Sequence, residues 1–282
     1  MRWSDREESS NIEDRRGMSG GTKVGIGGVG LVIVVVYALA TGQNPLQILG
    51  QMSQGTGASV QGDYKPSPHE EELRKFTAVV LKDTENVWHD QFNRIGRSYV
   101  EPKLVMFSGQ VESNCGLADA GMGPFYCGED QDVYIDLSFY DELKQKFGAQ
   151  GDFAQAYVIA HEVGHHVQKQ LGTLDKVHAL QSQSSQARAN ELSVRLELQA
   201  DFYAGLWAHQ AKEMEKLDEN DIRSALNAAD SIGDDTLQKR ARGYVQPDSF
   251  THGTSAQRVR WFMKGWESGD MREGDTFSVS KL

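Results

Sequence analysis

The chain has 282 residues, of which 39% are hydrophobic and 24% are charged, and its formal net charge is -11 at pH 7. This is the composition of an ordinary globular protein, long enough for one sizeable core or one domain with appendages. The negative charge argues against nucleic acid as the main partner, because binding a phosphate backbone requires an excess of lysine and arginine.

Near the N-terminus, residues 24–41 form an almost uninterrupted apolar run. Its length is at the lower end of what a membrane-spanning helix needs. Basic residues up to Lys23 precede the run, whereas the next basic residue after it is Lys65. This asymmetry predicts a single transmembrane helix with its N-terminal side in the cytoplasm. The alternative is a secretory signal cleaved after the small residues around Ala40, which would also export the rest of the chain.

The stretch after the apolar run is rich in Gly, Gln, Ser and Pro and has few large apolar side chains. Such a composition is typical of a flexible linker. No second linker and no repeat follows, so the remainder is expected to form one domain. The predicted organisation is therefore a charged cytoplasmic tail at 1–23, a transmembrane helix at 24–41, a linker at 42–68 and a folded domain at 69–282.

Within the domain, apolar residues at helical spacing predict a first helix that ends near Arg94. The sequences KLVMFSG and DVYIDLSF then indicate strands. In the second strand, Val133 and Ile135 are expected on one face and Tyr134 on the other. This strand, at 132–139, either offers a free edge to an extended peptide or lies inside the sheet with both edges paired.

The two cysteines, Cys115 and Cys127, are consistent with an exported domain. In an oxidising compartment they could close a short loop by a disulfide worth about 3 kcal/mol. Two free buried thiols are the alternative. Because they lack C-x-x-C spacing and further cysteines, a structural zinc site is not indicated.

The best-marked helix begins at Asp152, a favourable N-cap residue, with Gln155 completing a capping-box pattern. Gly172 marks its expected end. The predicted fold class is therefore α+β with helices dominant and a small sheet. Further helices are expected at about 184–210, 219–242 and 255–267.

The sequence AHEVGHHVQ lies in the middle of this helix. His161 and His165 are four residues apart, so they share a helix face with Cβ atoms about 6 Å apart and could bind one ion. His166 points roughly 100° away from them. Glu162 lies where it could reach a metal-bound water without being a ligand, which completes an H-E-x-x-H pattern. Gly164 costs a helix about 1 kcal/mol relative to alanine, so another element is expected to approach it closely. The alternative is a pair of surface histidines on an ordinary helix.

A catalytic zinc ion needs a third protein ligand besides water. In RLELQADFYAG, Glu197 and Asp201 again share a helix face among apolar neighbours, and buried carboxylates need partners. Glu197 is the expected third ligand, and Asp201 is expected to accept a hydrogen bond from the far nitrogen of His161. Alternatively, both acids make ordinary helix-surface contacts, or Glu191 supplies the third ligand.

The combination of H-E-x-x-H with E-x-x-x-D on a later helix resembles the gluzincins. More narrowly, AHEVGHHVQ, VRLELQADFYAG, FTHGTSAQRVRWF, GPFYCGEDQDVYIDLSFYDEL and the N-terminal MRW…DRRG are similar to the YpfJ-like family of neutral zinc metallopeptidases. The resemblance covers nearly the whole chain. It implies a zincin-like metalloprotease domain at 69–282 that uses Zn²⁺ and acts on peptide or protein substrates. Phe202 departs from the pattern, because a smaller residue is expected after the aspartate.

The residue types also imply a mechanism. Zinc lowers the pKa of a bound water toward about 7, and Glu162 takes the proton and later delivers it to the leaving amine. By similarity to thermolysin-like sites, His252 is the candidate that stabilises the oxyanion. The alternative is that His252 only belongs to the loop before the next helix. Arg258 either orients His252 or pairs with an acid.

The functional hypothesis is a membrane-anchored zinc metallopeptidase that faces the periplasm or the cell exterior, bacterial by resemblance, with no nucleic acid partner. A non-catalytic, zinc-stabilised binding or chaperone-like protein is the main alternative. The function of such a protein would not depend on Glu162. A zinc hydrolase acting on another amide, such as a cell-wall bond, is the third possibility. The sequence leaves the oligomeric state open.

Overall fold

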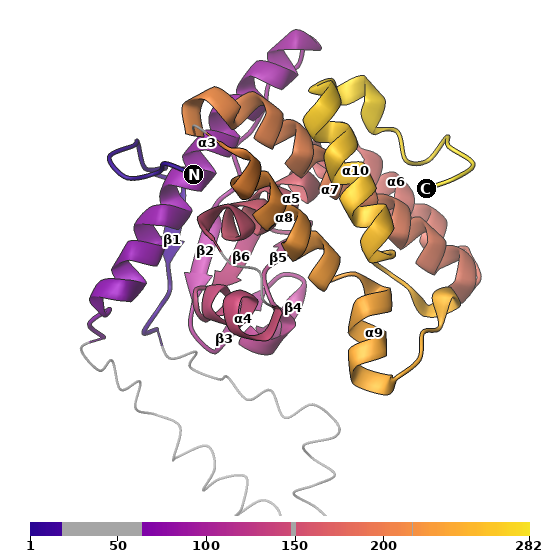
Figure 1. The fold of residues 1–282 in the computed structure, drawn as a ribbon, viewed down its shortest axis with the longest axis horizontal. Helices are drawn as coiled ribbons and strands as arrows, with labels where there is room; N and C mark the ends of the chain where they lie inside the picture. Colours follow the sequence, from indigo (N-terminus) through magenta and orange to yellow (C-terminus); the bar gives the residue numbers. More distant parts are fainter. Residues whose placement is uncertain (19–63, 148–150, 216) are drawn as a thin grey trace, which may run out of the picture. The chain divides into compact units, whose positions relative to one another are not determined.

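The computed structural model of the chain describes residues 1–18, 64–147, 151–215 and 217–282, and the strands within them form two sheets. The strands are β1 (Ile12–Asp14), β2 (Leu104–Phe107), β3 (Gln110–Ser113), β4 (Gly116–Asp119), β5 (Phe125–Cys127) and β6 (Asp132–Asp136). The larger sheet has the order β1-β2-β6-β5 (Figure 1). β1 and β6 both pair with β2 in parallel, β5 pairs with β6 antiparallel, and β3 and β4 form a separate hairpin.

Helices build most of the remaining described structure, so the predicted helix-dominated α+β class with a small sheet is confirmed. Ser67 caps the first long helix through its hydroxyl and with Glu70 forms a capping box. The helices are α3 (Pro68–Arg94), α4 (Ser138–Phe147), α5 (Asp152–Leu171), α6 (Thr173–Gln181), α7 (Gln186–Glu215), α8 (Glu219–Ser231), α9 (Asp234–Arg242) and α10 (Ser255–Ser268), with 3₁₀ turns at Ala120–Met122, Pro247–Ser249 and Met271–Gly274.

The central strand β2 is buried on both faces. Leu104 and Met106 join the main core, together with apolar residues of the helices. Val105 and Phe107 point the other way into a second cluster, to which the β3–β4 hairpin contributes Val111. A strand covered on both faces reads as a continuous apolar run, which explains the sequence LVMF.

β6 lies inside the sheet, paired with β2 on one edge and β5 on the other. Val133 and Ile135 belong to the main core and Tyr134 to the second cluster, which confirms the predicted alternation. The free-edge interpretation of residues 132–139 is wrong. The strand also ends earlier than expected, at Asp136, because α4 begins two residues later.

One predicted helix is two helices in the structure. The segment expected at 219–242 breaks between α8 and α9, at Gly233. A Cβ atom at Gly233 would lie 2.4 Å from the backbone nitrogen of Ser255, at the start of α10. The chain therefore bends where α10 packs against it, a tertiary contact that the helical periodicity does not reveal.

The N-terminal segment is part of the folded domain. Met1–Arg15 and Pro66–Leu282 form one compact unit. The N-terminal ammonium lies 2.6 Å from Asp221 Oδ1, and Arg6 pairs with Asp83 on α3. β1 then extends the larger sheet along the edge of β2.

The prediction of a single transmembrane helix is wrong, and so is the single-pass membrane location derived from it. One crossing at 24–41 would place residues 1–23 and the domain on opposite sides of a bilayer, whereas β1 is hydrogen-bonded into the domain's own sheet. Among the described residues, no helix combines the length and apolar character needed to cross a membrane. The predicted segment itself, with most of the predicted linker at 42–68, lies outside the described residues.

α7 and α10 contact each other backbone to backbone. A Cβ atom on Gly205 would lie 1.9 Å from the carbonyl oxygen of Phe262, and one on Gly265 would lie 2.0 Å from that of Phe202. The ring of Phe202 is fully buried and packs against a third glycine, because a Cβ atom on Gly274 would lie 2.6 Å from it. The backbone contact fixes α7 against α10, and α7 carries the predicted third ligand.

We expect Gly205→Ala to lower the free energy of unfolding by about 1–3 kcal/mol or more, because the added methyl group must push two packed helices apart. Denaturant unfolding measures this change. Gln186→Ala, an exposed substitution on the same helix, should stay within about 0.5 kcal/mol of wild type. Equal stability of the two variants would show that the crossing relaxes at no cost.

Candidate active site

α5 carries the H-E-x-x-H sequence and is fixed at both ends. It ends at Gly172, whose φ of 81° lies in the left-handed region, as predicted. The predicted N-cap role of Asp152 is wrong, because Gly151 occupies that position. The Asp152 carboxylate instead accepts a hydrogen bond from Trp3 Nε1 at 2.9 Å. The N-terminal segment therefore uses the group that the sequence assigned to the cap.

His161, His165 and Glu197 bring one ligand atom each to within 4.8 Å of one another. Glu197 Oε2 lies 3.1 Å from His161 Nε2, and its Oε1 lies 3.5 Å from His165 Nε2. Ligand atoms bound to a tetrahedral zinc ion at about 2.0–2.2 Å are about 3.3–3.6 Å apart. The spacing of the three side chains therefore fits a zinc ion.

The charges around these side chains also fit a divalent cation. Among the described residues at the site, the carboxylates of Glu162, Glu197 and Asp201 face one buried guanidinium, that of Arg258. The three carboxylates thus outnumber the one permanently charged group, and a bound cation can balance the remaining negative charge. Burial lowers the pKa of His161, but the charge of Asp201 and hydrogen bonds to Asp201 and Glu197 raise it to about 10.

Gly164 confirms the expected close approach of another element. A Cβ atom there would lie 3.1 Å from the carbonyl oxygen of Ala200 and 3.2 Å from its Cα. The backbone of α7 therefore lies directly against α5 at this point. Because Ala200 lies between Glu197 and Asp201 in the sequence, the contact brings both acids to the histidines.

Glu162 lies in the same cavity as the three candidate ligands, which has a volume of about 590 Å³. Its side chain does not belong to the ligand cluster, and only 9% of the residue is exposed. Burial raises the pKa of this carboxyl, although the neighbouring His161 and His165 oppose the change. A carboxylate with a raised pKa is suited to accept and return a proton near neutral pH.

Asp201 supports His161 from behind. Its Oδ1 lies 2.9 Å from His161 Nδ1, and the residue is fully buried. Arg258 holds both carboxylate oxygens, with Nε at 2.8 Å and Nη2 at 3.0 Å, and the Tyr157 hydroxyl donates to Oδ1 at 2.5 Å. Burial favours the neutral acid, but the charges of Arg258 and His161 lower the pKa of Asp201 to about 2. Two roles were considered for Arg258, orienting His252 or pairing with an acid. The structure shows the second, with Asp201 as the acid.

His165 has a support that the sequence analysis did not assign. Its Nδ1 lies 2.9 Å from Oε1 of Gln168, a residue with no exposed surface. Gln168 is part of the stretch AHEVGHHVQ, and its i, i+3 spacing from His165 on a helix was the available signal.

His252 lines the cavity as well, with 49% of its side chain exposed. Asp234, at the start of α9, holds its loop, because Oδ2 accepts hydrogen bonds from the backbone N–H groups of Thr251, His252 and Gly253 at 2.7, 2.6 and 3.0 Å. Hydrogen bonding to Asp234 raises the pKa of His252, and the charge of Glu197 adds to this effect while burial opposes it. An imidazolium on the cavity wall is suited to stabilise a negative charge in the cavity.

Two neighbouring groups lie outside the ligand cluster. His166 points away from the site, as predicted: its Nε2 lies 2.7 Å from the carbonyl oxygen of Val100, and its Nδ1 lies 3.1 Å from the hydroxyl of Tyr126. Burial lowers the pKa of His166 to about 4. Glu191, the rival third ligand, pairs instead with Arg195 on its own helix.

β5 is the edge strand beside the cavity. Phe125 and Tyr126 of this strand line the cavity, and in the described sheet β5 pairs only with β6. Its outer edge is therefore the one available to an extended peptide, the role considered from sequence for 132–139.

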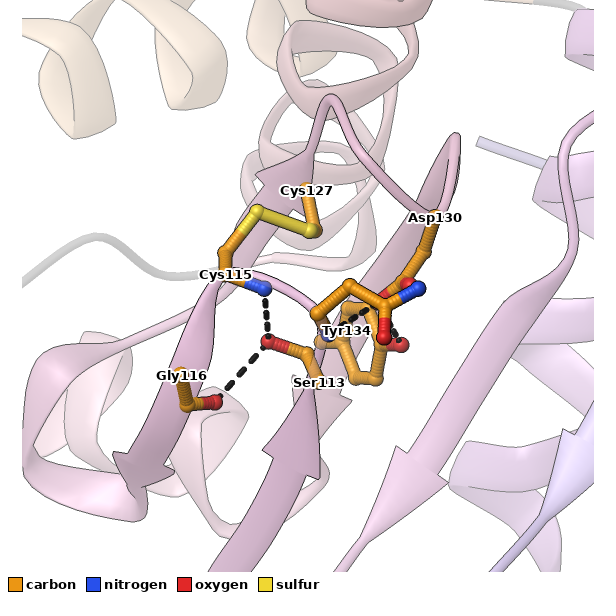
Figure 2. The surroundings of a disulfide bond; sticks show 7 residues. Ser113, Cys115, Gly116, Cys127, Asp130 and Tyr134 are labelled. Atoms are coloured by element: carbon orange, nitrogen blue, oxygen red, sulfur yellow. Dashed lines mark hydrogen bonds between the residues drawn. A yellow bond between two sulfur atoms is a disulfide. The ribbon is translucent and has the colours of Figure 1, made fainter.

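The predicted disulfide between Cys115 and Cys127 is confirmed (Figure 2). It joins the turn of the β3–β4 hairpin to the last residue of β5, with Cα atoms 5.8 Å apart. In the turn, the Ser113 hydroxyl accepts a hydrogen bond from the Cys115 N–H and donates one to the Gly116 carbonyl. Because Cys115 also lines the cavity, the bond anchors the cavity wall at the end of β5.

Comparison with known proteins gives a consistent family match. Residues 1–277 match the family described as "Putative neutral zinc metallopeptidase". The "Uncharacterized protein YpfJ" of Escherichia coli K12 is 50% identical over 286 residues, which cover 99% of this chain and 100% of that protein. The "Uncharacterized protein Mb2605" of Mycobacterium bovis is 43% identical over 195 residues, 65% of each chain. No solved structure matches.

Proposed function

Since this chain belongs to the family of neutral zinc metallopeptidases, we propose that it hydrolyses peptide bonds with His161, His165 and Glu197 holding a zinc ion. The strongest support is the meeting of these side chains with Glu162 in one cavity. A purely structural zinc site has four protein ligands, whereas a catalytic site has three and an open position. Three ligands beside a buried carboxylate favour catalysis over a zinc-stabilised binding protein.

Glu162 is the proposed general base. A zinc ion in such a site supplies a Lewis acid that makes water acidic enough to lose a proton near neutral pH and that polarises a carbonyl. Glu162 accepts the proton of the attacking water and returns it to the leaving amine. Because burial raises its pKa, Glu162 can hold that proton between the two steps.

The remaining residues orient and balance these groups. Asp201 accepts the Nδ1–H of His161, which leaves Nε2 free to bind the ion, and Arg258 compensates the buried charge of Asp201. His252 donates a hydrogen bond to the substrate oxygen as negative charge develops on it, while Asp234 keeps the His252 loop in place.

The substrate is proposed to bind as an added strand along the outer edge of β5. Backbone hydrogen bonds then give affinity that does not depend on the peptide sequence. Contacts between the cavity wall and the peptide side chains give specificity. Phe125, Phe139 and Leu237 contribute apolar surface to that wall. Peptides with large apolar residues near the cleaved bond are therefore the expected substrates.

Metal removal tests this proposal. The full chain should cleave members of a mixed peptide library detected by mass spectrometry, and a zinc chelator should reduce cleavage by at least about 100-fold, with zinc restoring it. Cleavage that persists in the metal-free protein would contradict the proposal. So would the absence of cleavage across the library while zinc is bound stoichiometrically.

A further inference from the structure

A chain of buried amide groups runs from the candidate metal ligand His165 to the C-terminal segment. His165 Nδ1 lies 2.9 Å from Gln168 Oε1. The Gln168 amide nitrogen donates to the carbonyl of Leu196 at 2.7 Å and to Gln199 Oε1 at 3.2 Å. Gln199 donates in turn to the carbonyl of Gly274 at 2.8 Å. Three separate parts of the chain, α5, α7 and the last 3₁₀ turn, are thus joined at this ligand.

The direction of the hydrogen bonds along this chain is fixed. Backbone carbonyls only accept, so the carbonyl of Gly274 requires the NH₂ group of Gln199, and the carbonyl of Leu196 requires the NH₂ group of Gln168. Each amide must therefore turn its oxygen toward the histidine. With the Gln168 oxygen facing it, His165 Nδ1 must carry the proton, and Nε2 presents its lone pair to the ion.

Because the amides of Gln168 and Gln199 are buried, reversing the direction of their hydrogen bonds is costly. Gln168 has no exposed surface, and Gln199 is 6% exposed. Reversing the Gln168 amide would place its NH₂ group against His165 Nδ1–H and its oxygen against the carbonyl of Leu196. Reversing the Gln199 amide would place its oxygen against the carbonyl of Gly274, and burial leaves little water to compensate either change. Leu196 also directly precedes Glu197, so Gln168 links two of the three candidate ligands through its two ends.

We infer that Gln168 and Gln199 are positioning residues that select the Nδ1-protonated form of His165 and hold its ring for metal binding, with Gln199 acting through Gln168. The inference rests on the proposed zinc site. Unlike Asp201 behind His161, these amides add no charge. They therefore orient the ligand without disturbing the balance between the carboxylates, Arg258 and a divalent ion.

Zinc affinity of the full chain, measured by competition with a chelator, tests the inference. Gln168→Met should weaken zinc binding by about 10–100-fold, as expected for loss of a hydrogen-bond partner behind a metal ligand. Gln199→Met should weaken it by about 3–10-fold, and its effect should vanish when Gln168 is already Met. The control, Gln170→Met, removes a glutamine of α5 that bonds to Val100 and His166 and should change affinity less than twofold.

Several outcomes would overturn the inference while leaving the proposed function intact. Unchanged zinc affinity in Gln168→Met would show that Gln168 does not position His165. Additive effects of the two substitutions would show that Gln199 does not act through Gln168. If Gln168→Met does not fold, long-range ¹H–¹⁵N spectra of the zinc-bound wild-type chain decide: a proton on His165 Nδ1 supports the inference, and zinc bound through Nδ1 contradicts it. If the wild-type chain binds no zinc, the proposed function fails, and the inference that rests on it fails as well.

Discussion

Glu162→Gln is expected to lower kcat for peptide hydrolysis by about 10²–10⁴-fold while zinc stays bound in stoichiometric amount. The amide has nearly the shape of the carboxylate but cannot accept the proton of the attacking water. Because Glu162 is not one of the three side chains that converge as ligands, its replacement leaves their geometry unchanged. The loss should therefore appear in kcat, with little change in KM.

The experiment compares peptide cleavage and metal content of the variant with those of Glu191→Gln. Glu191 is a glutamate on the neighbouring helix that pairs with Arg188 and Arg195, and its replacement should leave both quantities unchanged. If Glu162→Gln cleaves peptides at the wild-type rate, the general-base role is excluded. If it loses zinc, Glu162 is a ligand and the site has been assigned incorrectly.

Arg258→Met is expected to produce the largest loss of stability, about 3–5 kcal/mol. Arg258 is 3% exposed and holds both oxygens of Asp201, which is fully buried. Without the guanidinium, Asp201 keeps only the hydrogen bonds of Tyr157 and His161 against the cost of burying its charge.

Denaturant unfolding at saturating zinc, with the disulfide intact, measures this loss. Arg260→Met, on the same helix, removes an exposed arginine bonded to the carbonyl of Leu282 and should cost less than about 1 kcal/mol. Adding Asp201→Asn to Arg258→Met should recover part of the stability, because the unpaired charge is then gone. A small effect of Arg258→Met alone would mean that water reaches Asp201.

The part of the site that was predictable from sequence has local signals. Helical geometry alone places His161 and His165 on one face and turns His166 away. Gly172 ends α5 because the left-handed conformation there favours glycine. The apolar neighbours of Glu197 indicate a partner for it, since a carboxylate at a buried helix position needs one.

The remainder depends on contacts between distant parts of the chain. Asp234 reaches the His252 loop across the bend between α8 and α9, and that bend follows from packing at Gly233. Gln199 meets Gln168 only because α5 and α7 approach closely at Gly164. No spacing within one helix encodes these pairs.

The N-terminal region shows the same limit. The strand sequence IED has no apolar alternation. It pairs because the edge of β2 offers backbone N–H and C=O groups for hydrogen bonding. The transmembrane prediction considered apolar length and flanking charge but not the contacts of residues 1–15 with the domain. Those contacts are what a single crossing at 24–41 cannot accommodate.

Zinc content of the Glu197→Ala variant tests the central claim most directly. The full chain, dialysed against limiting free zinc, should bind one equivalent, and Glu197→Ala should lose it while Glu191→Ala retains it. That result would show that α5 and α7 together form the site, as the distances from Glu197 to His161 and His165 indicate. Full zinc retention by Glu197→Ala would contradict the assignment of Glu197 as the third ligand.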